Sequence, residues 1–259
     1  MNTSLSNYNA LVCGASSGIG AAIAQVLSQA GARLILLARR QEQLEHVRCG
    51  LDTPERHQCL GIDLHDLDGL KSKIKAIADA QPIHILINNA GGPPGGALLD
   101  ASTQDFEKAF RLHVLASQTL AQLLVPSMKK QGYGRIINII STSVKAPIPN
   151  LGVSNTIRGA MGNWSKTLAT ELGPHHITVN NVLPGFTDTQ RLGQLKEATA
   201  KRLNKSVEEV DQLWKSKVPL GRLAAPEEVA NAVAFLASPE ASYINGINLP
   251  VDGGRTPSL

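Results

Sequence analysis

The chain has 259 residues, of which 42% are hydrophobic and 18% charged, and its formal net charge is +4. This composition predicts a folded globular protein and argues against extensive disorder. The basic residues are dispersed, which argues against a nucleic-acid partner. The three cysteines lack metal-ligand spacing, so we expect reduced thiols and no bound metal. Because no signal peptide or membrane-spanning run is visible, we expect a cytoplasmic protein without a membrane partner.

Short apolar runs alternate with longer amphipathic segments along the chain, a pattern typical of repeated β-α-β units. Aromatic residues make up only 3% of the chain, which favours an aliphatic parallel sheet buried on both faces. We therefore expect one α/β domain over residues 1–259, with a doubly wound parallel sheet of seven strands and helices on both faces. The expected strands are Asn9–Cys13, Arg33–Ala38, His57–Asp63, Ile83–Asn88, Gly134–Ile140, Thr178–Leu183 and Ile247–Val251.

Helices are expected between these strands, where apolar residues recur at helical spacing. The expected ranges are Ile19–Ala30, Arg40–Gly50, Leu67–Ala80, Thr103–Gln131, Val153–Leu172 and Pro226–Ala237. A polar region at about residues 189–218 interrupts the alternation, although its composition favours helix. One interpretation is a helical insertion that covers a substrate site, and the other is a plain surface excursion.

A glycine-rich turn follows the first expected strand and contains Gly14, Gly18 and Gly20. The first glycine allows a tight turn, the second lets the backbone approach a diphosphate, and the third permits close packing of the helix. Amide groups at the start of that helix would then face the phosphates. Similar turns also occur in β-α-β units that bind nothing, so the turn alone is a weak signal.

Further motifs follow at the ends of later strands. They are Asp63, Asn88-Asn-Ala-Gly91, Ser141, Pro184-Gly185 and Val251-Asp-Gly-Gly254. In this order and spacing, the chain resembles the short-chain dehydrogenase/reductase family along essentially its whole length, and most closely the 3-oxoacyl-[acyl-carrier-protein] reductases. The resemblance implies a Rossmann-type fold and a small-molecule carbonyl or alcohol substrate, such as an acyl thioester. It also implies a homo-oligomer, expected to be a tetramer, in which the long fourth and fifth helices pair across subunits and Asp252–Leu259 reaches a second interface.

The resemblance also assigns the contacts to a dinucleotide cofactor. The phosphate loop comprises Gly14, Ser16, Ser17, Gly18, Ile19 and Gly20; the adenosine side comprises Asp63, Leu64, Asn89, Ala90 and Gly91; the nicotinamide side comprises Pro184, Gly185, Thr187 and Thr189. Cys13 replaces the family's usual threonine, which removes a supporting hydrogen bond but no cofactor contact.

Arg39 and Arg40 follow the second expected strand, where an acidic side chain would bind ribose hydroxyls and repel a 2′-phosphate. Two guanidinium groups are suited to phosphate recognition. The alternative is that they are merely solvated charges at a strand end. Because no carboxylate is adjacent, we expect NADP(H) to be preferred over NAD(H).

The expected catalytic positions depart from the family pattern. The resemblance implies a tyrosine, a lysine four residues later, a serine and an asparagine, but this chain has Ser154, Arg158, Ser141 and His113 at those positions. This indicates a divergent subgroup without the Tyr-x-x-x-Lys pair. Arg158 and Ser154 share one helix face, and the guanidinium can donate to ribose hydroxyls. The serine hydroxyl is shorter and less acidic than a phenol.

Other proton donors are weaker candidates. His113 titrates near neutrality when unperturbed and would feed a water chain to Ser154, or it is simply a structural residue of its helix. Lys145 is a second proton source or a solvated loop residue. The loop Gly91–Gly96 and the pair Pro147 and Pro149 either rim a substrate pocket or shape turns. Two functions follow: an NADP(H)-dependent oxidoreductase with an atypical site, or a catalytically silent dinucleotide-binding sensor or structural protein.

Overall fold

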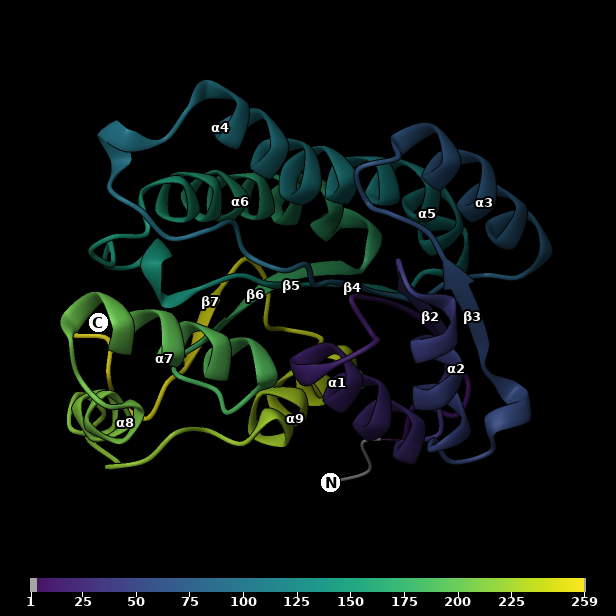
Figure 1. Ribbon diagram of the computed structural model, residues 1–259. Helices are drawn as coiled ribbons and strands as arrows, with labels where there is room; N and C mark the ends of the chain where they lie inside the picture. Colours follow the sequence, from purple (N-terminus) through teal and green to yellow (C-terminus); the bar gives the residue numbers. More distant parts are fainter. Residues whose placement is uncertain (1–3, 259) are drawn as a thin grey trace.

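A seven-stranded parallel sheet forms the centre of the computed structural model, which describes residues 4–258 (Figure 1). The strand order is β3-β2-β1-β4-β5-β6-β7, and every adjacent pair is parallel. The strands are β1 (Asn9–Cys13), β2 (Arg33–Ala38), β3 (Gln58–Gly61), β4 (Ile85–Asn88), β5 (Gly134–Ile139), β6 (Ile177–Pro184) and β7 (Asn248–Val251). The predicted sheet is confirmed.

Strand β3 is shorter than the expected range His57–Asp63, and side-chain hydrogen bonds at both ends explain the difference. At the start, the His57 imidazole accepts from the Leu34 amide at 3.1 Å and so occupies a backbone donor of the neighbouring strand. At the end, the Asp63 carboxylate accepts from the His65 amide at 2.9 Å and begins a turn. Such local bonds compete with strand pairing.

Helices cover both faces of the sheet (Figure 1). In the view shown, α1, α2 and α9 lie below the sheet, and α3, α4, α5 and α6 lie above it. Helices α1, α2 and α9 pack against one apolar cluster and α3, α5 and α6 against a second, while α4 and part of α6 contribute to a third. The helices are α1 (Gly18–Gln29), α2 (Gln41–Cys49), α3 (Leu67–Ala80), α4 (Thr103–Phe110), α5 (Ala116–Gln131), α6 (Gly152–Leu172), α7 (Gln190–Leu203), α8 (Val207–Lys215) and α9 (Pro226–Ala237).

The strand order reverses its direction of growth between β1 and β4. From β1 the chain continues outward to β2 and β3, whereas from β4 it continues to β5 on the opposite side. The loops after β1 and β4 therefore diverge and leave a crevice at the carboxyl ends of these strands, which is where doubly wound sheets bind ligands.

The segment expected as one helix over Thr103–Gln131 contains a single π-helical turn, Arg111–Leu115, between α4 and α5. His113 and Val114 in this turn are buried. Single π-turns inside α-helices are frequent at functional sites. The apolar spacing predicts one continuous helix over Thr103–Gln131 and does not indicate this π-turn.

The polar region expected at about 189–218 contains α7 and α8, which form a small unit with its own apolar cluster. Asp211 on α8 forms ion pairs with Lys196 on α7 and with Lys215, the latter at 2.6 Å. The Trp214 ring stacks on Phe186 with centroids 4.9 Å apart. We call Gln190–Lys215 the α7–α8 unit.

Within residues 4–258, no helix is long and apolar enough to cross a bilayer. In the same residues, no group of three or more His, Cys, Asp or Glu side chains is arranged to hold a metal ion. Leu259, the last residue of the expected second interface, lies outside the described residues.

Candidate functional site

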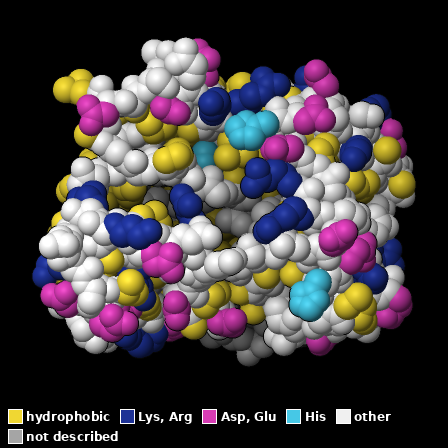
Figure 2. Space-filling model, in the orientation of Figure 1, with side chains coloured by type: hydrophobic (Ala, Val, Ile, Leu, Met, Phe, Trp, Pro, Cys, Tyr) yellow, Lys and Arg dark blue, Asp and Glu magenta, His cyan; other side chains and the backbone are white. Residues whose placement is uncertain are grey.

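A cleft of about 980 Å³ lies at the crevice between the ends of β1 and β4. The space-filling view shows a central hollow with dark blue Lys and Arg side chains around it (Figure 2). Most of the expected cofactor residues line the cleft, from segments far apart in sequence. These are Gly14, Ser16, Ser17, Gly18, Ile19, Gly20, Arg39, Arg40, Asp63, Leu64, Asn89, Ala90, Gly91, Arg158 and Thr189.

Three expected nicotinamide-side residues, Pro184, Gly185 and Thr187, do not line this cleft. A Cβ on Gly185 would lie 2.7 Å from the Asp252 Cα, so this glycine allows the end of β6 to pack against the C-terminal segment. Thr187 is buried and pairs with Ala224 in an isolated bridge. Gly185 and Thr187 thus have packing contacts in this structure, and a role of the three residues toward the nicotinamide stays a prediction.

The glycine turn after β1 has the geometry that a diphosphate requires. Gly14 has a φ of +61° and Gly18 a φ of +54°, both in the left-handed region that favours glycine. A Cβ on Gly20 would lie only 2.0 Å from the Gly14 carbonyl oxygen, so the helix can pack this closely only without a side chain. Ser17, the N-cap of α1, makes no capping bond with its side chain, which leaves first-turn amides for an anionic ligand.

Asn89 joins the ends of β4 and β1 beneath the cleft. Its Nδ2 donates to the Cys13 carbonyl at 3.2 Å and to the Gly14 carbonyl at 3.4 Å. Burial raises the pKa of the Cys13 thiol to about 12, so this side chain is a neutral packing residue. The hydrogen bonds of Asn89 hold the glycine turn in place although the family's threonine is replaced.

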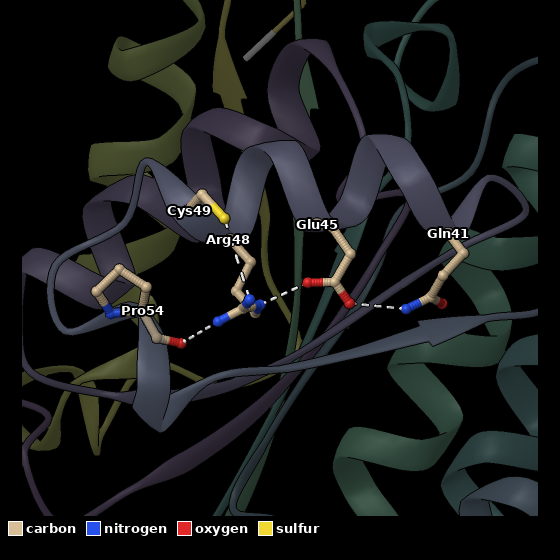
Figure 3. Close-up of polar contacts among 5 residues, drawn as sticks. All are labelled: Gln41, Glu45, Arg48, Cys49 and Pro54. Atoms are coloured by element: carbon tan, nitrogen blue, oxygen red, sulfur yellow. Dashed lines mark hydrogen bonds and ion pairs between the residues drawn. The ribbon is translucent and has the colours of Figure 1, made fainter.

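Arg39 and Arg40 are exposed at the adenosine end of the cleft and form no ion pair within residues 4–258. Helix α2 has two acidic side chains: Glu42, in its first turn, forms no ion pair in the described residues, and Glu45 accepts from Arg48 Nε at 2.7 Å and from Gln41 Nε2 at 2.9 Å (Figure 3). Arg48 also donates to the Pro54 carbonyl at 2.8 Å. Neither carboxylate of α2 pairs with Arg39 or Arg40, so both guanidinium groups can meet a ligand.

Arg158 is the most unusual charge in the cleft, because its side chain is buried with 6% exposure and has no carboxylate partner in the described chain. Nη1 donates to the Ile139 carbonyl at 3.0 Å and Nη2 to the Ala90 carbonyl at 3.4 Å, while the buried Nε makes no hydrogen bond. Burial lowers the pKa of the guanidinium to about 10, so it remains a cation at neutral pH. It connects the ends of β4 and β5 and also lines the cleft.

The expectation that His113 titrates near neutrality is wrong. Burial, followed by the positive charge of Arg158, lowers the pKa of His113 to about 2, and a hydrogen bond to the Gly91 backbone does not offset this. Nε2 is buried and makes no hydrogen bond. Both His113 and Arg158 line a small cavity of about 10 Å³, near the smallest volume that holds one water molecule. The imidazole is neutral and cannot donate a proton as an imidazolium.

The two serines do not line the main cleft. Ser141 follows β5, and its Oγ accepts from the Ser143 amide at 3.1 Å. Ser154 lies in the first turn of α6, one turn before Arg158, and is half-buried without a side-chain hydrogen bond in the described residues. Lys145 is half-buried after the short turn that begins at Ser141.

Comparison with known proteins identifies the family. The family model described as Enoyl-(Acyl carrier protein) reductase matches residues 14–256. The gluconate 5-dehydrogenase of Gluconobacter oxydans is 34% identical over 99% of this chain and 97% of its own. The chain belongs to the short-chain dehydrogenase/reductase family. Another relative, the 3-oxoacyl-[acyl-carrier-protein] reductase of Aquifex aeolicus, is 33% identical over 98% of this chain and 99% of its own.

Solved structures agree with this assignment. The L-sorbose reductase of Gluconobacter frateurii, complexed with NADPH and L-sorbose, superimposes with a TM-score of 0.93 at 31% identity and covers 100% of both chains. The NADPH-dependent reductase YwfH, involved in bacilysin biosynthesis, gives a TM-score of 0.92 at 31% identity over 97% of this chain and 99% of its own.

No tyrosine of the described residues lines the cleft, although the family resemblance implies a catalytic tyrosine. The chain has only Tyr8, Tyr133 and Tyr243, and none of them lines the cleft. Tyr8 and Tyr133 stack on each other 4.2 Å apart, and the Tyr133 hydroxyl donates to the Ala237 carbonyl at 2.6 Å. These residues lie at the amino end of the sheet, and Tyr243 is fully exposed.

Two features of the site escaped the sequence analysis. The amino-terminal part of α7 contributes Gln190, Arg191 and Gln194 to the cleft, although no motif pointed to them. A buried chain of hydrogen-bonded side chains runs across β4 to β7 close to the site. Its bonds are Asn88 to Asn138 at 2.8 Å, Asn138 to Asn181 at 3.0 Å and Asn181 to Asn248 at 2.8 Å. Asparagines at these positions interrupt the apolar pattern of the strands, and this interruption could have indicated the hydrogen-bonded chain from the sequence.

Proposed function

We propose that this protein is an NADP(H)-dependent oxidoreductase that acts on a carbonyl or alcohol group of a small molecule through an atypical proton-transfer arrangement. The observation that carries the proposal is the cleft itself, where the glycine turn, Arg39 and Arg40 converge. Family membership and relatives described as NADPH-dependent reductases support it. When bound, the nicotinamide supplies or accepts a hydride.

The residues of the cleft fit such a cofactor. First-turn amides of α1 would hold the diphosphate, and Asp63 would accept from the adenine end. Gly91 and Gly92 would let a ligand approach closely, because nothing but the Arg158 guanidinium, 3.8 Å from a Cβ on Gly92, lies nearby. Arg39 and Arg40 would engage a 2′-phosphate, which favours NADP(H) over NAD(H).

Each residue at an expected catalytic position would have a separate role. Ser141 would orient the carbonyl from the end of β5, as the family resemblance implies. Arg158 would donate a remaining N–H to a ribose hydroxyl while its other donors hold the Ile139 and Ala90 carbonyls. Ser154 would pass a proton through a water molecule, because its hydroxyl is too short for direct transfer. His113, which lines a small cavity together with Arg158, would stay neutral and would not supply the proton.

The substrate would be a small molecule with a carbonyl or secondary alcohol group. The relatives' names cover a sugar acid, a ketose and a carrier-protein thioester, which share a carbonyl or secondary alcohol. The α7–α8 unit would cover the substrate, since its first turn already lines the cleft. We also propose a homotetramer, which is supported by exposed Phe110 and Leu115 beside α5 and by the fully exposed Tyr243.

A second candidate function is a catalytically silent dinucleotide-binding sensor or structural protein. The specific observation in its favour is that no tyrosine from the described residues lines the cleft. It requires the same glycine turn and the same Arg158, so cofactor binding does not separate the two candidates.

The experiment that separates them measures binding and turnover in the same preparation. NADPH is titrated by its fluorescence, and NADPH oxidation is then followed with a panel of ketoses, sugar acids and acetoacetyl thioesters. We expect binding together with slow turnover of at least one carbonyl. Binding without any turnover, in either direction, would favour the silent protein, and failure to bind would refute both.

A further inference from the structure

Helix α7 contributes an unassigned cation to the cleft. Arg191 lies in the first turn of α7 and lines the cleft together with Thr189, Gln190 and Gln194. Its side chain is exposed and forms no ion pair within residues 4–258. The family resemblance assigned a role to Thr189 but none to Arg191.

The charges that line the cleft are unbalanced. Four arginines, Arg39, Arg40, Arg158 and Arg191, face a single carboxylate, Asp63. Cations gathered in one concave site repel one another and raise the local concentration of an anionic ligand. Arg158 is already bound to two carbonyls, and Arg39 and Arg40 lie at the adenosine end.

The start of α7 lies against the phosphate loop. The Thr189 Cγ2 is 3.3 Å from the position that a Cβ on Gly18 would take. The Thr189 Oγ1 accepts from the Leu192 amide at 3.2 Å and so fixes the first turn of the helix. Arg191 is two residues further along the same turn and lines the cleft that the glycine turn also lines. Its planar guanidinium fork suits phosphate oxygens.

We propose that Arg191 binds the diphosphate of the dinucleotide and thereby couples cofactor binding to the position of the α7–α8 unit; this rests on the proposed function. The unit responds as one body because Asp211 joins Lys196 on α7 to Lys215 on α8. Its own apolar cluster includes Leu192, the residue next to Arg191. A contact at Arg191 is therefore transmitted to both helices, and the cofactor closes the cover before a substrate enters.

The test compares Arg191→Gln with the control Arg202→Gln. The control also removes one exposed positive charge from α7, but in its last turn, and Arg202 does not line the cleft. Dissociation constants for NADPH and NADH are measured by fluorescence titration. We expect Arg191→Gln to weaken both cofactors by about tenfold, since a charged hydrogen bond contributes about 1.5–3 kcal/mol. Arg202→Gln should leave both affinities unchanged. Hydrogen exchange should show that NADPH protects residues 190–203 in the native protein and in Arg202→Gln, but not in Arg191→Gln.

Two results would overturn the inference while leaving the proposed function intact. Unchanged affinity for both cofactors in Arg191→Gln would show that the side chain makes no contact with them. Loss of NADPH affinity alone would place Arg191 at the 2′-phosphate instead of the diphosphate. If the native protein binds neither dinucleotide, the proposed function itself is refuted.

Discussion

Replacing Arg158 with methionine should separate the stability of this protein from its cofactor affinity. The guanidinium is buried and has no carboxylate partner in the described residues, and burial lowers its pKa from 12.5 to about 10. A lowered pKa for a base means that the folded state disfavours the cation, at every pH below the folded pKa. Methionine has a similar length, so Arg158→Met removes the charge without opening a large cavity.

The opposing contributions are of similar size. At about 1.4 kcal/mol per pKa unit, the lowering corresponds to about 3 kcal/mol of cost for the buried cation, which the substitution removes. Against this, the substitution removes the 3.0 Å hydrogen bond to the Ile139 carbonyl, worth about 1.5–3 kcal/mol, and the weaker 3.4 Å bond to the Ala90 carbonyl. We therefore expect the free energy of unfolding to change by no more than about 1–2 kcal/mol.

The assay is thermal unfolding with and without NADPH, combined with titration of the cofactor. Without ligand, the midpoint of Arg158→Met should stay within about 8 °C of the native value. NADPH affinity should fall by about tenfold, because the cleft loses a cation that faces the ligand. Arg158→Lys, which keeps the charge but has fewer donors, serves as the control and should bind NADPH more tightly than Arg158→Met. A loss of more than about 4 kcal/mol of stability, or unchanged affinity, would refute the reasoning.

Three further predictions test other parts of the site. Arg39→Asp should narrow or invert the preference for NADPH over NADH in a fluorescence titration, whereas Arg33→Asp, at the opposite end of β2, should not; equal affinities in the native protein would sink the idea. His113→Asn should make the stability of the protein less sensitive to acid. Because the pKa of His113 is about 2 in the folded state and about 6.5 in the unfolded state, the native protein should lose about 2 kcal/mol of unfolding free energy through this group by pH 5. Identical slopes of unfolding free energy against pH in the two proteins would contradict the burial argument. Light scattering should give a tetramer, and Tyr243→Ser should shift it to smaller species; a native monomer at micromolar concentration counts decisively against the proposed assembly.

Much of the fold could be predicted because its causes are local. A strand such as Leu34–Leu37 is apolar throughout, and the glycines at 14 and 18 adopt positive φ where a turn was expected. Strand ends were harder, since they depend on side chains such as His57 that bond to a neighbouring strand. These bonds require a partner distant in sequence, which periodicity does not contain.

The electrostatics of the site could not be predicted because they depend on burial. An isolated histidine titrates near neutrality, but the π-turn places His113 in the core beside the charge of Arg158. In the same way, the sequence alone left Arg191 in a polar segment without a motif, and only the fold brings that segment to the phosphate loop. The sequence identified candidate site residues by their type, but it did not predict which of them lie close together in the folded protein.

The missing tyrosine leads to a prediction about the reaction itself. The tyrosines of the chain lie away from the cleft, so the nearest hydroxyls at the expected catalytic positions are those of Ser141 and Ser154. A positioned general acid contributes roughly 10²–10⁴-fold to the rate, and reduction of acetoacetyl thioesters should therefore be slower than in the family by about that factor.

Where a carbonyl substrate is turned over, Ser154→Ala should lower kcat by about tenfold or more, because the water molecule that carries the proton loses its anchor. The same variant should leave NADPH affinity nearly unchanged, since Arg158 rather than Ser154 lines the cleft. This split between rate and affinity distinguishes a role in proton transfer from simple packing. Family-typical turnover that Ser154→Ala does not affect would show that the proton donor lies elsewhere. The double change Ser154→Tyr with Arg158→Lys restores both family groups, and it should raise the rate because the phenol oxygen then reaches a carbonyl held by Ser141.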